Sequence, residues 1–283
     1  MLDSTFQLLS GLGPARERRL WREGVGCWAD LPAAPAVALG RLDAGALGAA
    51  VVQAQGALAR GDADQLATML PPGEHWRLFA EFGDDAAYLD IETSDDDVAF
   101  AGISAIGILD RQGPRIFLAG RDLHLFPQAA RGYAMLVTFN GSSFDLPILA
   151  RAFPAWRPPV CHVDLRHLLA RLGHHGGLKS IEREQALRDL QLARPPHLAR
   201  LGGWDAGWLW RRGRGPGGDR DALRVFVEYN LHDVIHLRTL MAYGYNALVD
   251  QVDAPAVRAR VRPLPVPTRG DVLYDVSKIL LGL

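Results

Sequence analysis

Cysteine, lysine and long apolar runs are scarce in this chain of 283 residues. The two cysteines, Cys27 and Cys161, lie far apart with no C-x-x-C spacing, which fits reduced thiols in a cytoplasmic compartment. The longest strongly apolar stretch without a charge, residues 98–109, has 12 residues, whereas a membrane-spanning helix needs about 20. The first residues contain no basic region of the kind that begins a secretory signal. We therefore expect a soluble, cytoplasmic protein with no membrane segment.

Glycine and proline are also too few for a disordered chain. The 30 glycines and 18 prolines fall short of the roughly 25–30% of residues that marks low-complexity disorder, and 48% of the residues are apolar. A chain of this length and composition can bury a real core. The usual size of roughly 100–200 residues per domain allows one large domain or two unequal ones.

Basic residues are absent from one segment, and lysine is nearly absent from the whole chain. The net charge is only −1, but residues 81–97 contain eight acidic residues and no basic one, which leaves 31 basic and 24 acidic residues elsewhere. An acidic site in an otherwise basic chain suits a metal-dependent enzyme that acts on phosphates; an acidic surface loop facing a basic helix is the alternative. Only Lys179 and Lys278 are lysines, and this preference for arginine indicates genome composition.

The N-terminal residues predict two helices joined by a glycine turn. Phe6, Leu8 and Leu9 precede the glycine turn at 11–13, and Pro14 suits the first position of a basic amphipathic helix expected over residues 15–23. A glycine turn that opens a helix offers unpaired N–H groups to a phosphate. The segment resembles the hairpin of helix-hairpin-helix nucleic-acid-binding modules; a helical cap packed on the main domain is the alternative.

The remaining pattern predicts a helical connector followed by a mixed α/β sheet. Helices are expected at 44–59 and 63–69, and from residue 86 the pattern changes to strands. Three antiparallel strands followed by alternating helix and strand indicate a five-stranded mixed sheet flanked by helices. The expected strands are 87–91, 100–109, 115–119, 134–139 and 160–163, and the expected helices lie around 122 and over 143–151, 165–172 and 221–248.

Two acidic residues share one face of the first expected strand. Alternation places Asp90 and Glu92 on the same side, with Leu89 and Ile91 on the other. Paired carboxylates are unfavourable on an otherwise apolar strand unless a cation compensates them. Such a pair suits Mg²⁺ or Mn²⁺, which prefer oxygen ligands. A strand end turning into solvent is the alternative.

Two further acids occupy helices that this layout brings near the strand. Asp145 follows a strand and a glycine turn, in the first turn of a helix, where an acid also stabilises the helix itself. Asp233 lies four residues after Tyr229, so both share one face of the long final helix. A buried aspartate in that helix needs a partner.

Together these residues resemble the DEDD exonucleases of the tyrosine subclass, which have a ribonuclease H-like fold. The likeness rests on Leu-Asp-Ile-Glu-Thr at 89–93, on Phe-Asn-Gly-x-x-Phe-Asp-x-Pro at 139–147 and on Tyr-Asn-x-x-Asp-Val at 229–234. These phrases look most similar to the bacterial YprB-like proteins, which carry a similar N-terminal segment. The resemblance covers residues 5–31 and 86–245. The histidine subclass would need a histidine at position 228, which is Glu228.

The resemblance implies a two-metal phosphodiester hydrolase. Asp90, Glu92, Asp145 and Asp233 would hold two Mg²⁺ or Mn²⁺ ions, with Tyr229 orienting the attacking water. A phenol with a pKa near 10 is a poor base at neutral pH, so Tyr229 would not abstract the proton. We expect a 3′–5′ exonuclease acting on DNA or RNA, with a single-stranded 3′ end as substrate. The alternatives are a non-catalytic nucleic-acid-binding or adaptor protein and an endonuclease with the same site.

Several residues outside the acids are candidates for contact with nucleic acid. Three tryptophans at 204, 208 and 210 stand beside basic residues, as in a single-strand platform, although core packing also explains them. Asp164 is expected to cap the next helix rather than contact substrate. The nucleic-acid-binding candidates are Gly11, Gly13, Asn140, Lys179, Arg211 and Arg212. The expected domains are a helix-hairpin-helix-like segment (1–35), a helical connector (36–85), the ribonuclease H-like domain (86–250) and a basic, proline-rich C-terminal arm (251–283).

Overall fold

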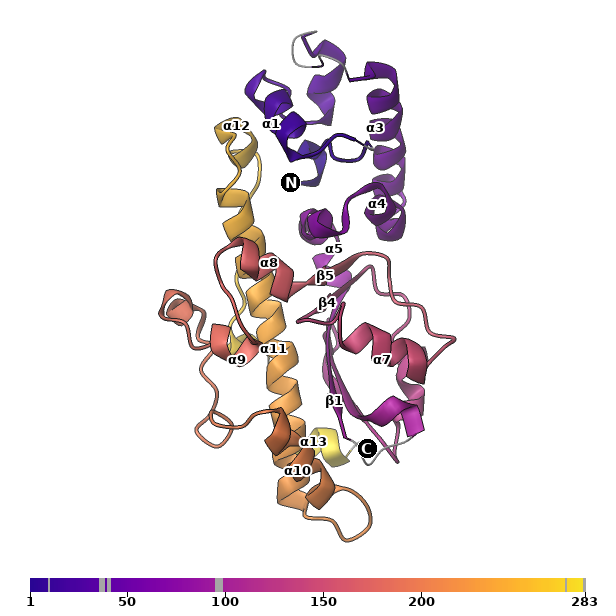
Figure 1. The fold of residues 1–283 in the computed structure, drawn as a ribbon, viewed down its shortest axis with the longest axis vertical. Coiled ribbons are helices and arrows are strands. Elements are labelled where there is room, and N and C mark those ends of the chain that lie inside the picture. The colour runs from indigo at the N-terminus through magenta and orange to yellow at the C-terminus, as the bar shows by residue number, and fades with distance from the viewer. Residues whose placement is uncertain (10, 36–38, 40–41, 95–98, 273, 282–283) are drawn as a thin grey trace.

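The computed structural model describes all of the chain except residues 10, 36–38, 40, 41, 95–98, 273, 282 and 283. Figure 1 shows the N-terminal helices at one end of the molecule and a sheet at the other, with helix α11 (Arg220–Asp250) running beside the sheet. Three acids of the acidic segment, Asp95, Asp96 and Asp97, lie outside the described residues.

The five strands form one mixed sheet in the order β3-β2-β1-β4-β5. β1 pairs antiparallel with β2, and β2 with β3, whereas β4 and β5 continue in parallel on the other side of β1. This confirms the predicted ribonuclease H-like α/β arrangement. The strands span Ala86–Thr93 (β1), Ile103–Asp110 (β2), Gly113–Leu118 (β3), Met135–Thr138 (β4) and His162–Asp164 (β5).

The second strand begins three residues later than predicted. Phe100 and Ala101 have φ values of 52° and 55°, and Gly102 has 83°, so the backbone is left-handed before the strand starts. A left-handed backbone cannot continue a β-strand. The apolar side chain of Phe100 instead packs against the core on one face of the sheet.

Side chains alternate between two cores, one on each face of the sheet. Tyr88 of β1 belongs to a core shared with Phe226 and Tyr245 of α11. Leu89 of β1 belongs to a second core with Leu149 of α7 (Asp145–Ala152). The sheet therefore lies between α11 and α7 (Figure 1). Asp90 and Glu92 alternate with Leu89, so they belong to the α11 face.

The other helices follow the sequence pattern closely in the connector and around the sheet. Helix α3 has the predicted bounds because Asp43 caps it by accepting from the N–H of Ala46 at 3.0 Å. Helix α8 begins at Leu165, directly after Asp164. The α-helices not given above span Pro14–Arg22 (α1), Ala44–Ala59 (α3), Ala63–Met69 (α4), Phe79–Phe82 (α5), Phe126–Ala129 (α6), Leu165–Arg171 (α8), Leu178–Ile181 (α9), Gly203–Gly213 (α10), Pro255–Arg258 (α12) and Val276–Leu281 (α13).

The predicted helix before Gly11 is wrong: residues 6–9 are not helical. The backbone N–H of Phe6 donates to the Glu17 carboxylate at 2.7 Å, and the side chains of Thr5 and Gln7 donate to the same group at 3.1 and 2.7 Å. In a helix the N–H of Phe6 would donate to a backbone carbonyl, but here it donates to the charged Glu17 carboxylate instead. Among the described residues before Gly11, only Leu2–Ser4 are helical, as a short 3-10 helix, so the first α-helix of the predicted hairpin is not formed there.

A buried ion network joins this N-terminal segment to the connector. The guanidinium of Arg77 donates to Glu17 at 2.9 Å and to Glu74 at 2.5 Å, and all three residues are buried. The core on the α11 face extends from Met1 to Val257. The domain boundaries at residues 35, 85 and 250 stay predictions.

The C-terminal residues lie along α11. Thr239 of α11 donates to the carbonyl of Pro267 at 2.8 Å, and Asn246 forms two hydrogen bonds with the backbone of Leu264. Val257 is buried in the same core. These contacts hold the proline-rich segment against the helix over much of its length.

Candidate metal site

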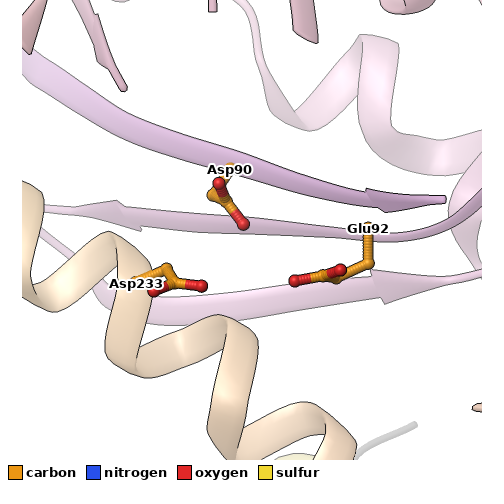
Figure 2. A group of neighbouring side chains, drawn as sticks. All are labelled: Asp90, Glu92 and Asp233. Atoms are coloured by element: carbon orange, nitrogen blue, oxygen red, sulfur yellow. The ribbon is translucent and has the colours of Figure 1, made fainter. Parts of the chain in front are cut away.

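Three of the predicted acids come together between β1 and α11. Asp90 and Glu92 extend from β1, and Asp233 extends toward them from α11 (Figure 2). One carboxylate oxygen from each lies within 4.8 Å of the other two. Asp90 and Glu92 are half-buried, and Asp233 is buried. We name these three residues the acidic triad.

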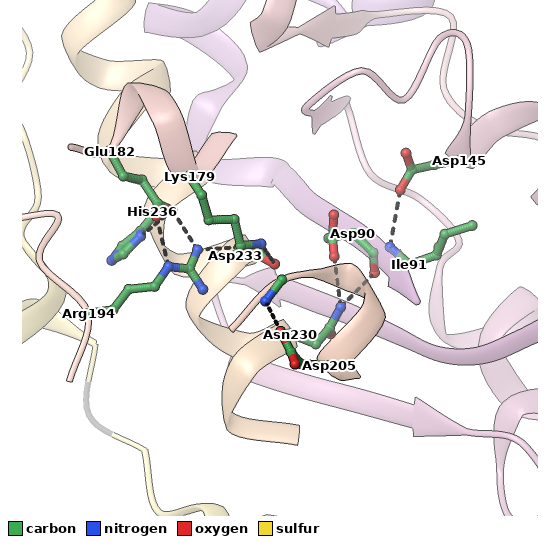
Figure 3. A network of polar contacts seen from close by, with 11 residues as sticks. Asp90, Ile91, Asp145, Lys179, Glu182, Arg194, Asp205, Asn230, Asp233 and His236 are labelled. Carbon is green, nitrogen blue, oxygen red and sulfur yellow. Dashed lines mark hydrogen bonds and ion pairs between the residues drawn. The ribbon is translucent and has the colours of Figure 1, made fainter. Parts of the chain in front are cut away.

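A glycine allows α11 to approach the sheet this closely. Gly107 of β2 pairs with Asp90 of β1, and a Cβ atom at Gly107 would lie 2.0 Å from the Asn230 amide oxygen. The Asn230 side-chain nitrogen donates to the Asp90 carboxylate at 2.9 Å (Figure 3). Asn230 therefore orients Asp90 from the helix that carries Asp233. The sequence analysis did not single out Asn230 as a site residue, although it lies in the motif at 229–234.

Asp145 lies next to the triad but is not part of it. It is 3% exposed at the start of α7, and its carboxylate accepts from the backbone N–H of Ile91 at 3.1 Å (Figure 3). Asp145 therefore contacts the strand between the two acids of β1.

The turn before α7 is fixed by Asp164. This residue caps α8, as predicted, by accepting from the N–H of Arg166 at 3.1 Å. It also accepts from the N–H of Asn140 at 2.7 Å and from the Ser142 hydroxyl at 2.5 Å. A Cβ atom at Gly141 would lie 2.2 Å from the Thr138 hydroxyl, so only glycine fits this turn. Asp164 thus positions Asp145 through the backbone.

Three of these neighbouring carboxyls, those of Asp90, Glu92 and Asp145, have raised pKa values. Burial raises the pKa of Asp90 well above its usual value, and the charges of Asp233, Asp145 and Glu92 add to this effect. Burial, with the charge of Asp233, raises the pKa of Glu92 to about 8. Burial also raises the pKa of Asp145 to about 7. A bound cation reverses this preference because it stabilises the ionised carboxylates.

Asp233 is contacted by two cations that the sequence analysis did not connect with it. Lys179 donates to both of its oxygens, at 2.9 and 2.7 Å, and Arg194 donates to one of them (Figure 3). Arg194 is held in turn by Glu182 at 2.5 and 2.7 Å, and Glu182 by His236 at 2.8 Å. Although burial alone would raise the pKa of Glu182, these hydrogen bonds lower it to about 2.

Tyr229 is buried beside the triad, one turn before Asp233. The Lys179 ammonium lies 4.2 Å from the centre of its ring, a cation–π contact. Burial raises the pKa of the Tyr229 phenol, so the group stays protonated at neutral pH. It can therefore donate a hydrogen bond but cannot act as a general base.

Two clefts adjoin the acidic residues. The first, of about 360 Å³, is lined by four basic and two acidic side chains, and two of the basic ones are the cations on Asp233. The second, of about 430 Å³, contains Glu92 together with exposed aromatic side chains. The basic cleft is lined by Lys179, Arg183, Arg188 and Arg194, and the aromatic cleft by Glu92, Phe144, Trp204 and Arg211, each with further residues.

The three tryptophans have different environments. Trp204 is 91% exposed in the aromatic cleft, Trp208 is 49% exposed, and Trp210 is buried in the core. Core packing is thus confirmed for Trp210 only. Arg212 lies over the Trp208 ring at 4.7 Å and pairs with Asp219 at 2.6 Å.

The remaining nucleic-acid candidates are Gly11, Gly13 and Asn140. Gly11 and Gly13 precede α1, which lies at the opposite end of the molecule from α10 (Figure 1). Asn140 has a left-handed backbone with φ 63°, and its side chain accepts from Arg166 at 2.7 Å. Their contact with nucleic acid stays a prediction.

None of the helices in the described part of the chain is long and apolar enough to span a membrane.

Comparison with known proteins gives one family. No curated protein and no solved structure matches the chain. A family model described as RNase H superfamily matches residues 87–245, a range that contains the acidic triad and Asp145. Because this range is more than half of the 283 residues, the chain belongs to the RNase H superfamily.

Proposed function

We propose that this protein is a divalent-metal-dependent nuclease that removes nucleotides from the 3′ end of DNA or RNA. The observation that carries the proposal is the convergence of Asp90, Glu92 and Asp233 within 4.8 Å, inside the part of the chain that matches the superfamily. The likeness of the motifs to tyrosine-subclass DEDD exonucleases supports the direction of degradation.

The donor set fits Mg²⁺ or Mn²⁺. Carboxylate oxygens are the ligands these ions prefer, and the triad supplies one from each of three side chains. Asp90, Glu92 and Asp233 would hold one ion, and Asp90 with Asp145 would hold a second. When bound, such ions supply an activated water and neutralise charge on the phosphate and the leaving oxygen.

The protein's own side chains position the reaction. The Asn230 amide orients the Asp90 carboxylate through its 2.9 Å hydrogen bond. The backbone N–H of Ile91 orients the Asp145 carboxylate in the same way. The protonated Tyr229 phenol donates to and orients the attacking water. Arg194, held by Glu182, keeps the Asp233 carboxylate turned toward its neighbours.

The two clefts supply complementary surfaces for a single strand. Arginine and lysine side chains in the basic cleft suit the phosphate backbone. The exposed ring of Trp204 in the aromatic cleft suits stacking against a base. Both cysteines are free and buried, which is consistent with a reducing compartment such as the cytoplasm.

Cleavage of 5′-labelled single-stranded DNA and RNA tests the proposal. We expect Mn²⁺- or Mg²⁺-dependent shortening from a free 3′ end, no activity in EDTA, and no shortening when the 3′ end is blocked. Asp233→Asn should abolish cleavage. Asp221→Asn is the matched control, because Asp221 lies in the same helix with its side chain 94% exposed.

The other outcomes separate the alternatives. Cutting of a circular single strand indicates an endonuclease with the same residues. Metal-independent binding without cleavage indicates a non-catalytic nucleic-acid-binding protein. Equal turnover in Asp233→Asn and the wild type contradicts a catalytic role for the triad.

A further inference from the structure

The two cations that contact Asp233 differ in how firmly they are held. The Arg194 side chain is 4% exposed, and two of its nitrogens are bonded to the buried carboxylate of Glu182. The Lys179 side chain is 26% exposed, and its ammonium lies over the Tyr229 ring. Arg194 is therefore fixed in the core, whereas Lys179 can rotate toward solvent.

Lys179 binds the Asp233 carboxylate, which the acidic triad would also use to bind a metal ion. Its ammonium contacts both oxygens of Asp233, at 2.9 and 2.7 Å, and one of these oxygens also accepts from Arg194. An ionised carboxylate has about four lone-pair positions. A divalent ion that binds Asp233 together with Asp90 and Glu92 therefore competes with the Lys179 ammonium for the same charge.

The composition of the chain makes a lysine at this position informative. Lysine occurs only at 179 and 278 among the 31 basic residues. An arginine fork would bind a carboxylate through two fixed hydrogen bonds, whereas a lysine ammonium is a compact charge on a flexible stem. A lysine at position 179 therefore releases the Asp233 carboxylate more easily than an arginine would.

We propose that Lys179 is an exchangeable counter-ion of Asp233, which a divalent cation displaces when it binds the acidic triad. This inference rests on the proposed function because it concerns the same site. Lys179 also lines the basic cleft, so its released ammonium joins Arg183 and Arg188 facing a substrate phosphate. Lys179 thereby lowers the affinity of the triad for metal and gains a second contact once the metal is bound.

Isothermal titration of the metal-free protein with Mn²⁺ tests the first consequence. Lys179→Gln should bind Mn²⁺ roughly tenfold more tightly than the wild type, because it removes a positive charge in direct contact with a ligand. Lys179→Arg keeps the charge and should not gain affinity. Arg188→Gln is the matched control, because it removes a charge from the same cleft without a described contact to Asp233. Asp90→Asn should bind least.

Nuclear magnetic resonance of lysine-labelled protein tests displacement itself. Only two lysine side chains give signals, and Lys278→Arg assigns them. Mg²⁺ should shift the Lys179 ammonium signal and leave that of Lys278 unchanged. Thermal unfolding in parallel should show a larger Mn²⁺-induced rise in Tm for Lys179→Gln than for the wild type.

The outcomes distinguish this inference from the proposed function. Equal or weaker Mn²⁺ binding by folded Lys179→Gln, or a Lys179 signal unmoved by Mg²⁺, overturns the inference while metal binding by the wild type stands. Absence of Mn²⁺ binding in the wild type overturns both.

Discussion

The approach of α11 to the sheet depends on the missing side chain at Gly107, and Gly107→Ala tests this directly. The new Cβ atom would lie 2.0 Å from the Asn230 amide oxygen and 3.4 Å from a methyl group of Val234. Asn230 is fully buried and its amide nitrogen is bonded to Asp90 at 2.9 Å. The amide cannot move away from the Cβ atom without breaking that bond.

The cost follows from these contacts. Overpacking a buried position costs about 1–3 kcal/mol, and a lost hydrogen bond to a charged group costs about 1.5–3 kcal/mol. Since either the helix moves or the bond breaks, we expect Gly107→Ala to lower the free energy of unfolding by about 2–3 kcal/mol. Asp90 also loses the amide that orients it, so Mn²⁺ affinity should fall.

Urea unfolding monitored by circular dichroism, with Mn²⁺ titration in parallel, measures both effects. Gly48→Ala in α3 is the control, because no atom outside the local backbone of the helix lies within 4 Å of its Cβ position. The same substitution there should stabilise the protein by about 0.5–1 kcal/mol, as alanine favours a helix. Adding Asn230→Ala to Gly107→Ala should recover stability by removing the clashing amide. Unchanged stability and Mn²⁺ affinity in Gly107→Ala would refute this account of the packing.

Three further predictions concern stability, pH and binding. Arg77→Met leaves the buried Glu17 carboxylate without its cation and should lower the free energy of unfolding by about 3–5 kcal/mol in urea. An unchanged free energy of unfolding would show that water solvates the pair. Because burial raises the pKa of Glu92 from 4.5 to about 8, the stability of the metal-free protein should fall as pH rises between these values, and Glu92→Gln should flatten that slope. Trp204→Ala should weaken binding of single-stranded oligonucleotides in EDTA by about tenfold in fluorescence anisotropy, whereas Trp208→Ala, outside the aromatic cleft, should change it less.

The sheet and the three acids of the triad were predictable because each depends on local sequence. Alternation along β1 places Asp90 and Glu92 on one face, and the four-residue spacing from Tyr229 places Asp233 on the matching face of α11. Packing of α11 on the sheet then brings the two faces together. The predicted start of β2 differed from the observed one because Phe100 has a left-handed backbone with φ 52°. The hydrophobic pattern of the sequence does not reveal such a conformation.

The contacts that tune the site were not predictable in this way. Lys179 and Arg194 reach Asp233 from segments 54 and 39 residues away in sequence, and the chain between them has little regular periodicity. The predicted helix at residues 6–9 was wrong for a similar reason. A single buried carboxylate, that of Glu17, takes the local hydrogen-bond donors, and this partner is ten or more residues away.

The placement of charge gives the strongest physical reason to expect a cation at this site. In the described residues around Asp233, five carboxylates lie near two cationic side chains, Lys179 and Arg194, and Arg194 is shared between Glu182 and Asp233. The five carboxylates are those of Asp90, Glu92, Asp145, Glu182 and Asp233. The acids of β1 lie on the face that packs against α11, where apolar side chains would give a more stable core. Lys179 relieves part of this excess negative charge and Asn230 orients one acid, but neither neutralises Asp90 or Glu92. A divalent ion supplies the charge that the chain lacks at this position, which is why its removal should leave these carboxyls partly protonated at neutral pH.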